Sequence, residues 1–125
     1  MQVPLIISNT TDLLRIMPDD ILYMMAEGNY SKVFSTDGDV VLVSFQLGQV
    51  EKMIASQLGE NSTDFIRVGR AIIANRNYIY MISLSRAQLV MKSPHCKKHV
   101  VEASKEALRD LKQLVDNSLK RKEQQ

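Results

Sequence analysis

The strongest constraint on the fold is a series of short apolar runs that are separated by polar or turn-forming residues. Runs of this length are typical of β-strands, because a helix in a globular domain usually extends over about ten residues or more. The runs lie at residues 5–8, 13–17, 21–25, 30–35, 40–43, 65–68, 71–74, 78–82, 88–91 and 97–101. The sequence therefore predicts a domain built mainly of β-strands.

One pair of runs carries a specific turn signal. Asp37 and Gly38 lie between the runs at residues 30–35 and 40–43. An Asp-Gly step suits a tight hairpin, because Gly readily adopts the positive φ that such a turn requires. We therefore expect these two runs to pair as an antiparallel β-hairpin.

Two segments have helical spacing instead. At residues 45–58 apolar side chains recur every three or four positions, with Ser44 placed to cap the first turn and Gly59 placed to end the helix. A second helix is predicted from Ser104 onward, where the apolar stripe consists of Ala107, Leu108, Leu111, Leu114, Val115 and Leu119. The predicted fold class is mainly β with short helices (α+β), in a single domain at residues 1–118 followed by a basic polar tail at 119–125.

Composition limits the class of protein. The chain has 125 residues, of which 45% are apolar and 24% charged, the balance of one soluble globular domain. Cys96 is the one cysteine, so no internal disulfide can form, which fits a reducing cytosol. No apolar run approaches the ~18–20 residues that span a bilayer, and the N-terminus has no signal-peptide pattern. The sequence predicts a cytoplasmic protein with no membrane partner.

Charge is divided unevenly along the chain. Residues 1–64 contain three Lys and Arg against nine Asp and Glu, a formal charge of −6, whereas residues 65–125 contain thirteen against five, a formal charge of +8. A concentration of cations favours a polyanion such as a nucleic acid as partner. The alternative is a basic C-terminal segment without a partner, since Lys120, Arg121 and Lys122 supply three of the charges.

Chemistry that would indicate an enzyme is missing from the sequence. His95, Cys96 and His99 form the one cluster of metal-ligating residue types, but they are too few and unsuitably spaced for a zinc site. No residue is identified that would orient His99 as a base for Cys96. The glycines are scattered singly, so no phosphate-binding loop is formed. We expect neither catalysis nor a cofactor.

Three separated stretches together resemble the LytTR family, the DNA-binding domain of many bacterial response regulators. Residues 21–30, ILYMMAEGNY, are similar to the family pattern I-x-Y-I-E-A-x-G-N-Y. Residues 65–75, FIRVGRAIIAN, are similar to F-x-R-V-H-R-S-x-I-V-N. In the region 100–111, Ser104 and Lys105 fall near the family's V-S-R at the start of the last helix. The resemblance covers roughly residues 5 to 115, and we expect a stand-alone domain without a receiver domain before these motifs.

The resemblance implies a particular fold and function. Family members have several small antiparallel sheets and bind double-stranded DNA as sequence-specific transcriptional regulators, with loops rather than a recognition helix in successive major grooves. A second copy on a direct-repeat site is compatible with this mode of binding. Carried over residue by residue, the resemblance assigns DNA contacts to Asn29, Tyr30, Ser31, Lys32, Arg67, Arg70, Ser104, Lys105 and Arg109.

Each assignment has a structural alternative. Asn29 can serve turn geometry, Tyr30 strand packing, and Arg70 can be an ordinary surface charge. Ser104 suits both a helix cap and a phosphate contact at the helix N-terminus. Asn75 matches a signature position of the family, and we predict a structural role in a turn for it.

The sequence departs from the family pattern at four positions: Met25 for Glu, Gly69 for His, Ala71 for Ser, and Glu106 at a base-reading Arg position. These changes affect polar positions and leave the apolar pattern intact, so they put base readout in question and not the fold. They support an alternative function, a protein-interaction module or antagonist on the same fold that binds DNA weakly or not at all.

Overall fold

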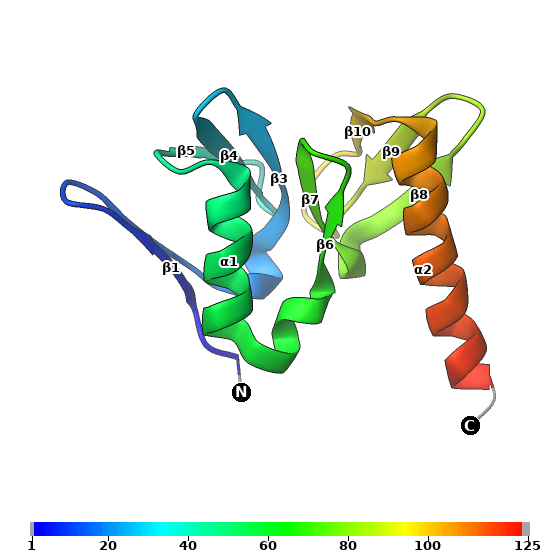
Figure 1. Cartoon of the computed structure of the whole chain (residues 1–125), viewed down its shortest axis with the longest axis horizontal. Helices are drawn as coiled ribbons and strands as arrows, with labels where there is room; N and C mark the ends of the chain where they lie inside the picture. Colours follow the sequence, from blue (N-terminus) through cyan, green and yellow to red (C-terminus); the bar gives the residue numbers. More distant parts are fainter. Residues whose placement is uncertain (1, 124–125) are drawn as a thin grey trace.

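A computed structural model describes the backbone of residues 2–123 and the side chains of residues 2–118 (Figure 1). Within this part there are ten strands, two α-helices and three short 3-10 helices. The elements are β1 Leu5–Ser8, β2 Leu13–Ile16, η1 Pro18–Asp20, β3 Ile21–Glu27, β4 Tyr30–Ser35, β5 Val40–Val43, α1 Leu47–Leu58, η2 Gly59–Asp64, β6 Phe65–Val68, β7 Ile72–Asn75, η3 Arg76–Tyr78, β8 Ile79–Ser83, β9 Gln88–Met91, β10 His99–Glu102 and α2 Lys105–Glu123.

The strands form three antiparallel sheets. The central sheet has the order β5-β4-β3-β7-β6, a second sheet has the order β10-β9-β8, and β1 pairs with β2 alone. Every predicted apolar run overlaps an observed strand. The Asp-Gly turn joins β4 to β5 as predicted, and Gly38 has a φ of 97°. The predicted α+β fold is confirmed.

The central sheet is buried on both faces. Side chains alternate between the faces along each strand, and two separate apolar cores result. Met24, Val33 and Ile73 face α1 and the β1–β2 hairpin, in a core that also contains Leu47, Val50, Ile54 and Leu58. Leu22, Ile72 and Ala74 face the opposite way, toward the β8–β9–β10 sheet and α2, where the core includes Leu89, Met91, Val101, Leu108 and Leu111.

The start of α1 differs from the prediction. The helix begins at Leu47, so Ser44 is not its N-cap; Gln46 occupies that position, and its backbone N–H donates to Gln49 Oε1 at 2.9 Å. The difference arises at Phe45, which packs against the first core while its carbonyl oxygen accepts a hydrogen bond from Ser31 at 2.8 Å. A residue held in this way cannot begin the helix. Gly59 ends α1 as predicted, with a φ of 55°.

The start of α2 agrees with the prediction. The Ala107 backbone N–H donates to Ser104 Oγ at 3.1 Å, so Ser104 caps the helix. At its other end α2 continues to Glu123, into the segment 119–125 that was predicted to be a tail. The side chains of that segment lie outside the described residues.

Asn75 has the structural role that the sequence predicted. It is 1% exposed at the end of β7. Its Nδ2 donates to the carbonyl oxygens of Ile21 at 2.9 Å and Pro18 at 3.3 Å, while its Oδ1 accepts from Asn77 N–H at 3.1 Å. One side chain therefore holds the start of β3 against the end of β7 and the turn that follows.

We expect Asn75→Ala to lower the free energy of unfolding by about 2–3 kcal/mol, because two buried carbonyl groups and the Asn77 N–H lose their partner. Urea unfolding followed by circular dichroism measures the change. Asn77→Ala is the matched control, since that side chain is exposed and a surface substitution changes stability by about 0.5 kcal/mol or less. Equal stability of both variants would refute the role given to Asn75.

Candidate nucleic-acid interface

Three connections that are far apart in the sequence lie at one edge of the molecule. The β3–β4 turn and the β6–β7 turn are at the same end of the central sheet, because Met25 on β3 pairs with Ile72 on β7 and Ala26 N–H donates to the Ala71 carbonyl oxygen at 2.8 Å. The start of α2 adjoins the second of these turns. Figure 1 shows the β3–β4 turn, the β6–β7 turn and the β10–α2 junction along the upper edge.

Gly69 allows the β6–β7 turn to approach α2. Its φ is 63°, a left-handed value that favours glycine. A Cβ atom placed at Gly69 would lie 3.4 Å from Ala107 Cβ. The departure from the family's His at this position therefore accompanies a close contact between the turn and the helix.

Arg70 is an exposed cation of this edge with no partner among the described residues. It is exposed at the tip of the β6–β7 turn, and no described residue accepts a hydrogen bond from its guanidinium or forms an ion pair with it. The guanidinium presents five N–H donors in a planar arrangement that matches two acceptors at once. Arg70 is thus available to an external acceptor.

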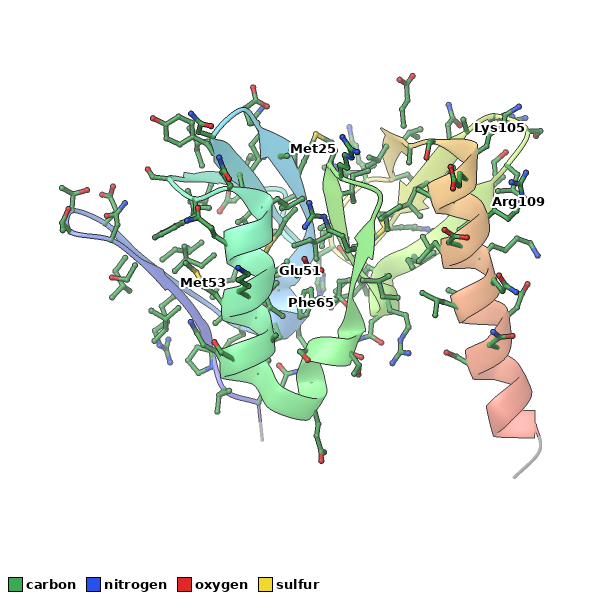
Figure 2. All side chains as sticks on the ribbon, viewed as in Figure 1. Met25, Glu51, Met53, Phe65, Lys105 and Arg109 are labelled. Carbon is green, nitrogen blue, oxygen red and sulfur yellow. The ribbon has the colours of Figure 1, made fainter. Side chains whose placement is uncertain are left out.

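Arg67 is in a different situation from Arg70. Its Nη1 pairs with Glu51 Oε1 on α1 at 3.0 Å, and its Nη2 donates to the Arg70 carbonyl oxygen at 2.7 Å. Its Nε is buried and has no partner among the described residues. Figure 2 shows Glu51 on the side of α1 toward β6 and β7. Arg67 therefore braces the β6–β7 turn against α1 and is not a free surface cation.

The β3–β4 turn presents only part of its predicted set. Asn29 and Tyr30 are exposed, and Asn29 Oδ1 accepts a hydrogen bond from Gln46 at 3.3 Å. Lys32 is half-buried, with its Nζ 3.2 Å from Glu27 Oε2. Ser31 is completely buried, and its hydroxyl donates to the Phe45 carbonyl oxygen, so its side chain is not accessible to DNA.

At the start of α2 the basic and the acidic side chains lie on different sides of the helix. Lys105 and Arg109 are one helical turn apart and project from the side of α2 away from β6 and β7 (Figure 2). Glu106 and Asp110 instead line a groove of about 540 Å³ between α2 and the β6–β7 turn. Arg67, Arg70 and Glu102 also line this groove. The predicted cations at the start of α2 therefore do not converge with those of the β6–β7 turn.

One further cation reaches this end of the molecule. Arg86 is exposed in the β8–β9 turn, and the next residue, Ala87, accepts a hydrogen bond from Ala103 N–H at 3.2 Å. This bond holds the turn beside the β10–α2 junction. Arg86 belongs to no family motif, so no motif selected it. The available signal in the sequence was its place in the turn between two predicted strands.

The comparison with known families identifies the domain. The model of a family described as the LytTr DNA-binding domain matches residues 11–116. The chain belongs to the LytTR family. A LytTr DNA-binding domain from Bacillus cereus is similar in structure, with a TM-score of 0.62 over 92% of this chain and 98% of that chain. The two are 15% identical in sequence, so this likeness concerns the fold alone. No curated protein matches the chain.

Membership of this family assigns the chain to a class of DNA-binding regulatory domains and not to a catalytic class. Among the described residues, no three His, Cys, Asp or Glu side chains are grouped in a way that would hold a metal ion. Over the same residues, neither α-helix combines the length and the apolarity needed to cross a membrane.

Three side chains of this LytTR domain have pKa values shifted by burial or by hydrogen bonds within the fold. Burial raises the pKa of Tyr23 to about 12 and also raises that of Tyr78. A hydrogen bond from the Ser35 hydroxyl lowers the pKa of Asp37 in the β4–β5 turn. These three groups lie away from the edge that carries Arg70, so they mark no acid or base there.

The bracing role of Arg67 leads to a stability prediction. Arg67→Ala should lower the free energy of unfolding by about 1–2 kcal/mol, because it removes a charged hydrogen bond to a carbonyl and a half-exposed ion pair. It should also accelerate hydrogen exchange at the amides of the β6–β7 turn. Arg67→Lys should restore only part of the protection of these amides from exchange, since one ammonium group cannot hold Glu51 and the Arg70 carbonyl oxygen in the planar geometry of the guanidinium.

Arg15→Ala is the matched control for this experiment. Arg15 is an exposed residue of β2, and its removal should leave the exchange of the β6–β7 turn unchanged. An Arg67→Ala variant whose turn exchanges at the wild-type rate would show that Arg67 does not hold the turn.

Proposed function

We propose that this LytTR domain is a sequence-specific transcriptional regulator that inserts its turns into successive major grooves of double-stranded DNA. The observation that best supports the proposal is the alignment of the β3–β4 turn, the β6–β7 turn and the β10–α2 junction along one edge. A major groove is about 12 Å wide and accepts any element that carries donors and acceptors to the base edges. A row of turns can therefore read a duplex without a recognition helix.

The exposed side chains divide into two roles. Arg70 would read a base, since its free guanidinium can donate two hydrogen bonds to a guanine. Asn29 and Tyr30 would enter a neighbouring groove from the β3–β4 turn. Contacts to phosphates would set the register, and the candidates for them are Lys32, Arg86, Ser104, Lys105 and Arg109. Ser31 is omitted because it is buried, and Arg67 acts by positioning the turn that carries Arg70.

Acidic side chains beside the edge reduce affinity in this proposal. Glu106 and Asp110 lie between the turn of Arg70 and the cations of α2, so a bound duplex would pass close to both carboxylates. The cations must outweigh this repulsion. Because each neutralised phosphate releases counterions, the affinity should fall steeply with salt.

The same acidic groove favours a second candidate function. A LytTR fold with carboxylates at its reading edge suits a protein-interaction module or antagonist that binds DNA weakly or not at all. The two candidates differ in whether the isolated domain binds any genomic fragment at low salt.

The proposal also covers the arrangement of the DNA site and the cellular compartment. Two copies on a direct-repeat site would present the same edge to the same side of the duplex, one after the other. A regulator of chromosomal genes in a bacterium would act in the cytoplasm.

Arg70→Ala should weaken binding to a duplex selected from the host genome by about tenfold or more, because a bidentate contact to guanine contributes about 1–3 kcal/mol of discrimination. Fluorescence anisotropy measures the dissociation constant. The logarithm of the wild-type affinity should fall with the logarithm of salt by about 0.9 per neutralised phosphate. Arg15→Ala, at an exposed position on β2, should bind as the wild type does.

Failure of the wild-type domain to bind every genomic fragment at low salt would contradict the proposal and favour the interaction module. An equal loss of DNA affinity for Arg70→Ala and Arg15→Ala would contradict the proposed role of Arg70. Such a result would mean that Arg70 contributes only through its positive charge and not through a specific contact.

Glu106→Gln should strengthen DNA binding by roughly threefold to tenfold, because it removes one negative charge near the phosphates at little change in shape. The gain in affinity should be similar for specific and non-specific duplexes, and it should become smaller at high salt because salt screens the charge. Glu60→Gln is the control, since Glu60 is an exposed residue of η2 outside the groove. A Glu106→Gln variant with unchanged affinity would mean that the duplex does not approach the groove.

A further inference from the structure

The outer face of the β8–β9–β10 sheet carries an unusual row of apolar side chains. Met81 and Val100 both lie opposite Val90 in the strand pairing, so the three project from the same face. Leu89, Met91 and Val101 occupy the inner face and pack in the second core. Val100 is 57% exposed and Met81 43% exposed. The outer face of an antiparallel sheet on the surface is usually polar, so a row of this kind points to a contact surface.

One end of this row is strongly cationic. Lys92 follows the end of β9 and Lys98 precedes the start of β10, and both side chains reach Tyr80, the exposed neighbour of Met81 on β8. Their Nζ atoms lie 5.1 and 4.6 Å from the centre of the Tyr80 ring. No described acidic side chain forms an ion pair with either lysine. The outer face therefore combines an apolar centre with an uncompensated positive end.

These features are distinct from the proposed DNA-binding edge. Ser83, Gln88 and Glu102 are paired at the end of the sheet that adjoins Ser104, whereas Lys92 and Lys98 flank the opposite end. The Tyr80 ring, which is 54% exposed, already has both lysine ammonium groups beside it, so the positive charge is gathered at this end of the row. The apolar row offers no donor to phosphates or base edges. A protein segment, with both carboxylates and apolar side chains, fits this surface better than a nucleic acid.

We propose that the outer face of the β8–β9–β10 sheet docks an acidic, apolar-anchored segment of a partner protein. Apolar side chains of the segment lie on Met81 and Val100, and its carboxylates face Lys92 and Lys98. Charge complementarity selects the partner, while the apolar row supplies the buried area. The domain would in this way bind a second macromolecule. This surface would remain free when a duplex lies along the edge formed by the β3–β4 turn, the β6–β7 turn and the β10–α2 junction.

The test uses a fluorescein-labelled synthetic peptide in which Asp and Leu alternate, together with an Asp-Ser peptide of equal charge. Fluorescence polarisation should show that the full chain binds the Asp-Leu peptide at least about tenfold more tightly than the Asp-Ser peptide. Lys92→Glu combined with Lys98→Glu should weaken binding by about tenfold or more, and so should Met81→Ser combined with Val100→Ser. Arg15→Glu combined with Lys52→Glu, at exposed positions elsewhere, should bind as the wild type does.

Several results would overturn the proposal. One is equal binding of the Asp-Leu peptide by the wild type and both surface variants, and another is equal binding of the two peptides. Binding to phosphatidylglycerol vesicles without binding to the peptide would make the surface a membrane contact. Loss of DNA affinity in the Lys92/Lys98 variant as large as that of Arg70→Ala would make it part of the DNA interface.

The DNA-binding proposal is tested separately. Arg70→Ala should leave peptide binding unchanged, so a domain that binds the peptide but no DNA would refute the proposed regulator and retain the docking surface. Because all the substituted side chains of the docking surface are exposed, we expect the variants to keep the wild-type circular dichroism spectrum and thermal midpoint.

Discussion

The structure depends on burying both faces of the central sheet at once. Met24 and Ile73 pack toward α1, while their neighbours along the chain, Met25 and Ile72, pack toward the β8–β9–β10 sheet and α2. Because successive side chains of a strand point in opposite directions, β3 and β7 can contribute to two cores only if both faces are covered. This requirement holds α1 and α2 on opposite sides and sets the positions of the turns that leave the sheet.

The candidate DNA-binding edge is a consequence of this arrangement. Strands β3 and β7 are antiparallel and in register near one end, so the turns that connect them to β4 and β6 emerge together. The positive φ of Gly69 brings the second turn close to Ala107, and the bonds of Arg67 fix it relative to α1. The turn that carries Arg70 is thereby held in place, which would lower the entropy lost in the proposed contact of Arg70 with a base.

Charge divides the surface of the domain into separate regions. Arg70 and the exposed residues of the β3–β4 turn lie on one side of the groove, Lys105 and Arg109 on the far side of α2, and the carboxylates of Glu106 and Asp110 between them. Lys92 and Lys98 belong to a further region, at the other end of the β8–β9–β10 sheet. The excess of cations in the second half of the chain is therefore not a single polyanion-binding surface. It supplies at least two surfaces with different partners in the proposals above.

The sequence alone determined the strands, the two helices, the Asp-Gly hairpin, the cap of α2 and the turn bond from Asn77 to Asn75, because each depends on residues close together in the chain. The buried bonds from Asn75 to Ile21 and Pro18 join distant segments and became visible only in the tertiary structure. The sequence assigned Ser31 to the DNA interface although alternation with Val33 and Ser35 in β4 already places that side chain inward. Tertiary structure decided the rest. The pairing of Arg67 with Glu51, the facing of Glu106 into the groove and the start of α1 at Leu47 all depend on contacts between distant segments. Local spacing carries no information about such contacts, since which side chain meets which is settled only when the two cores close.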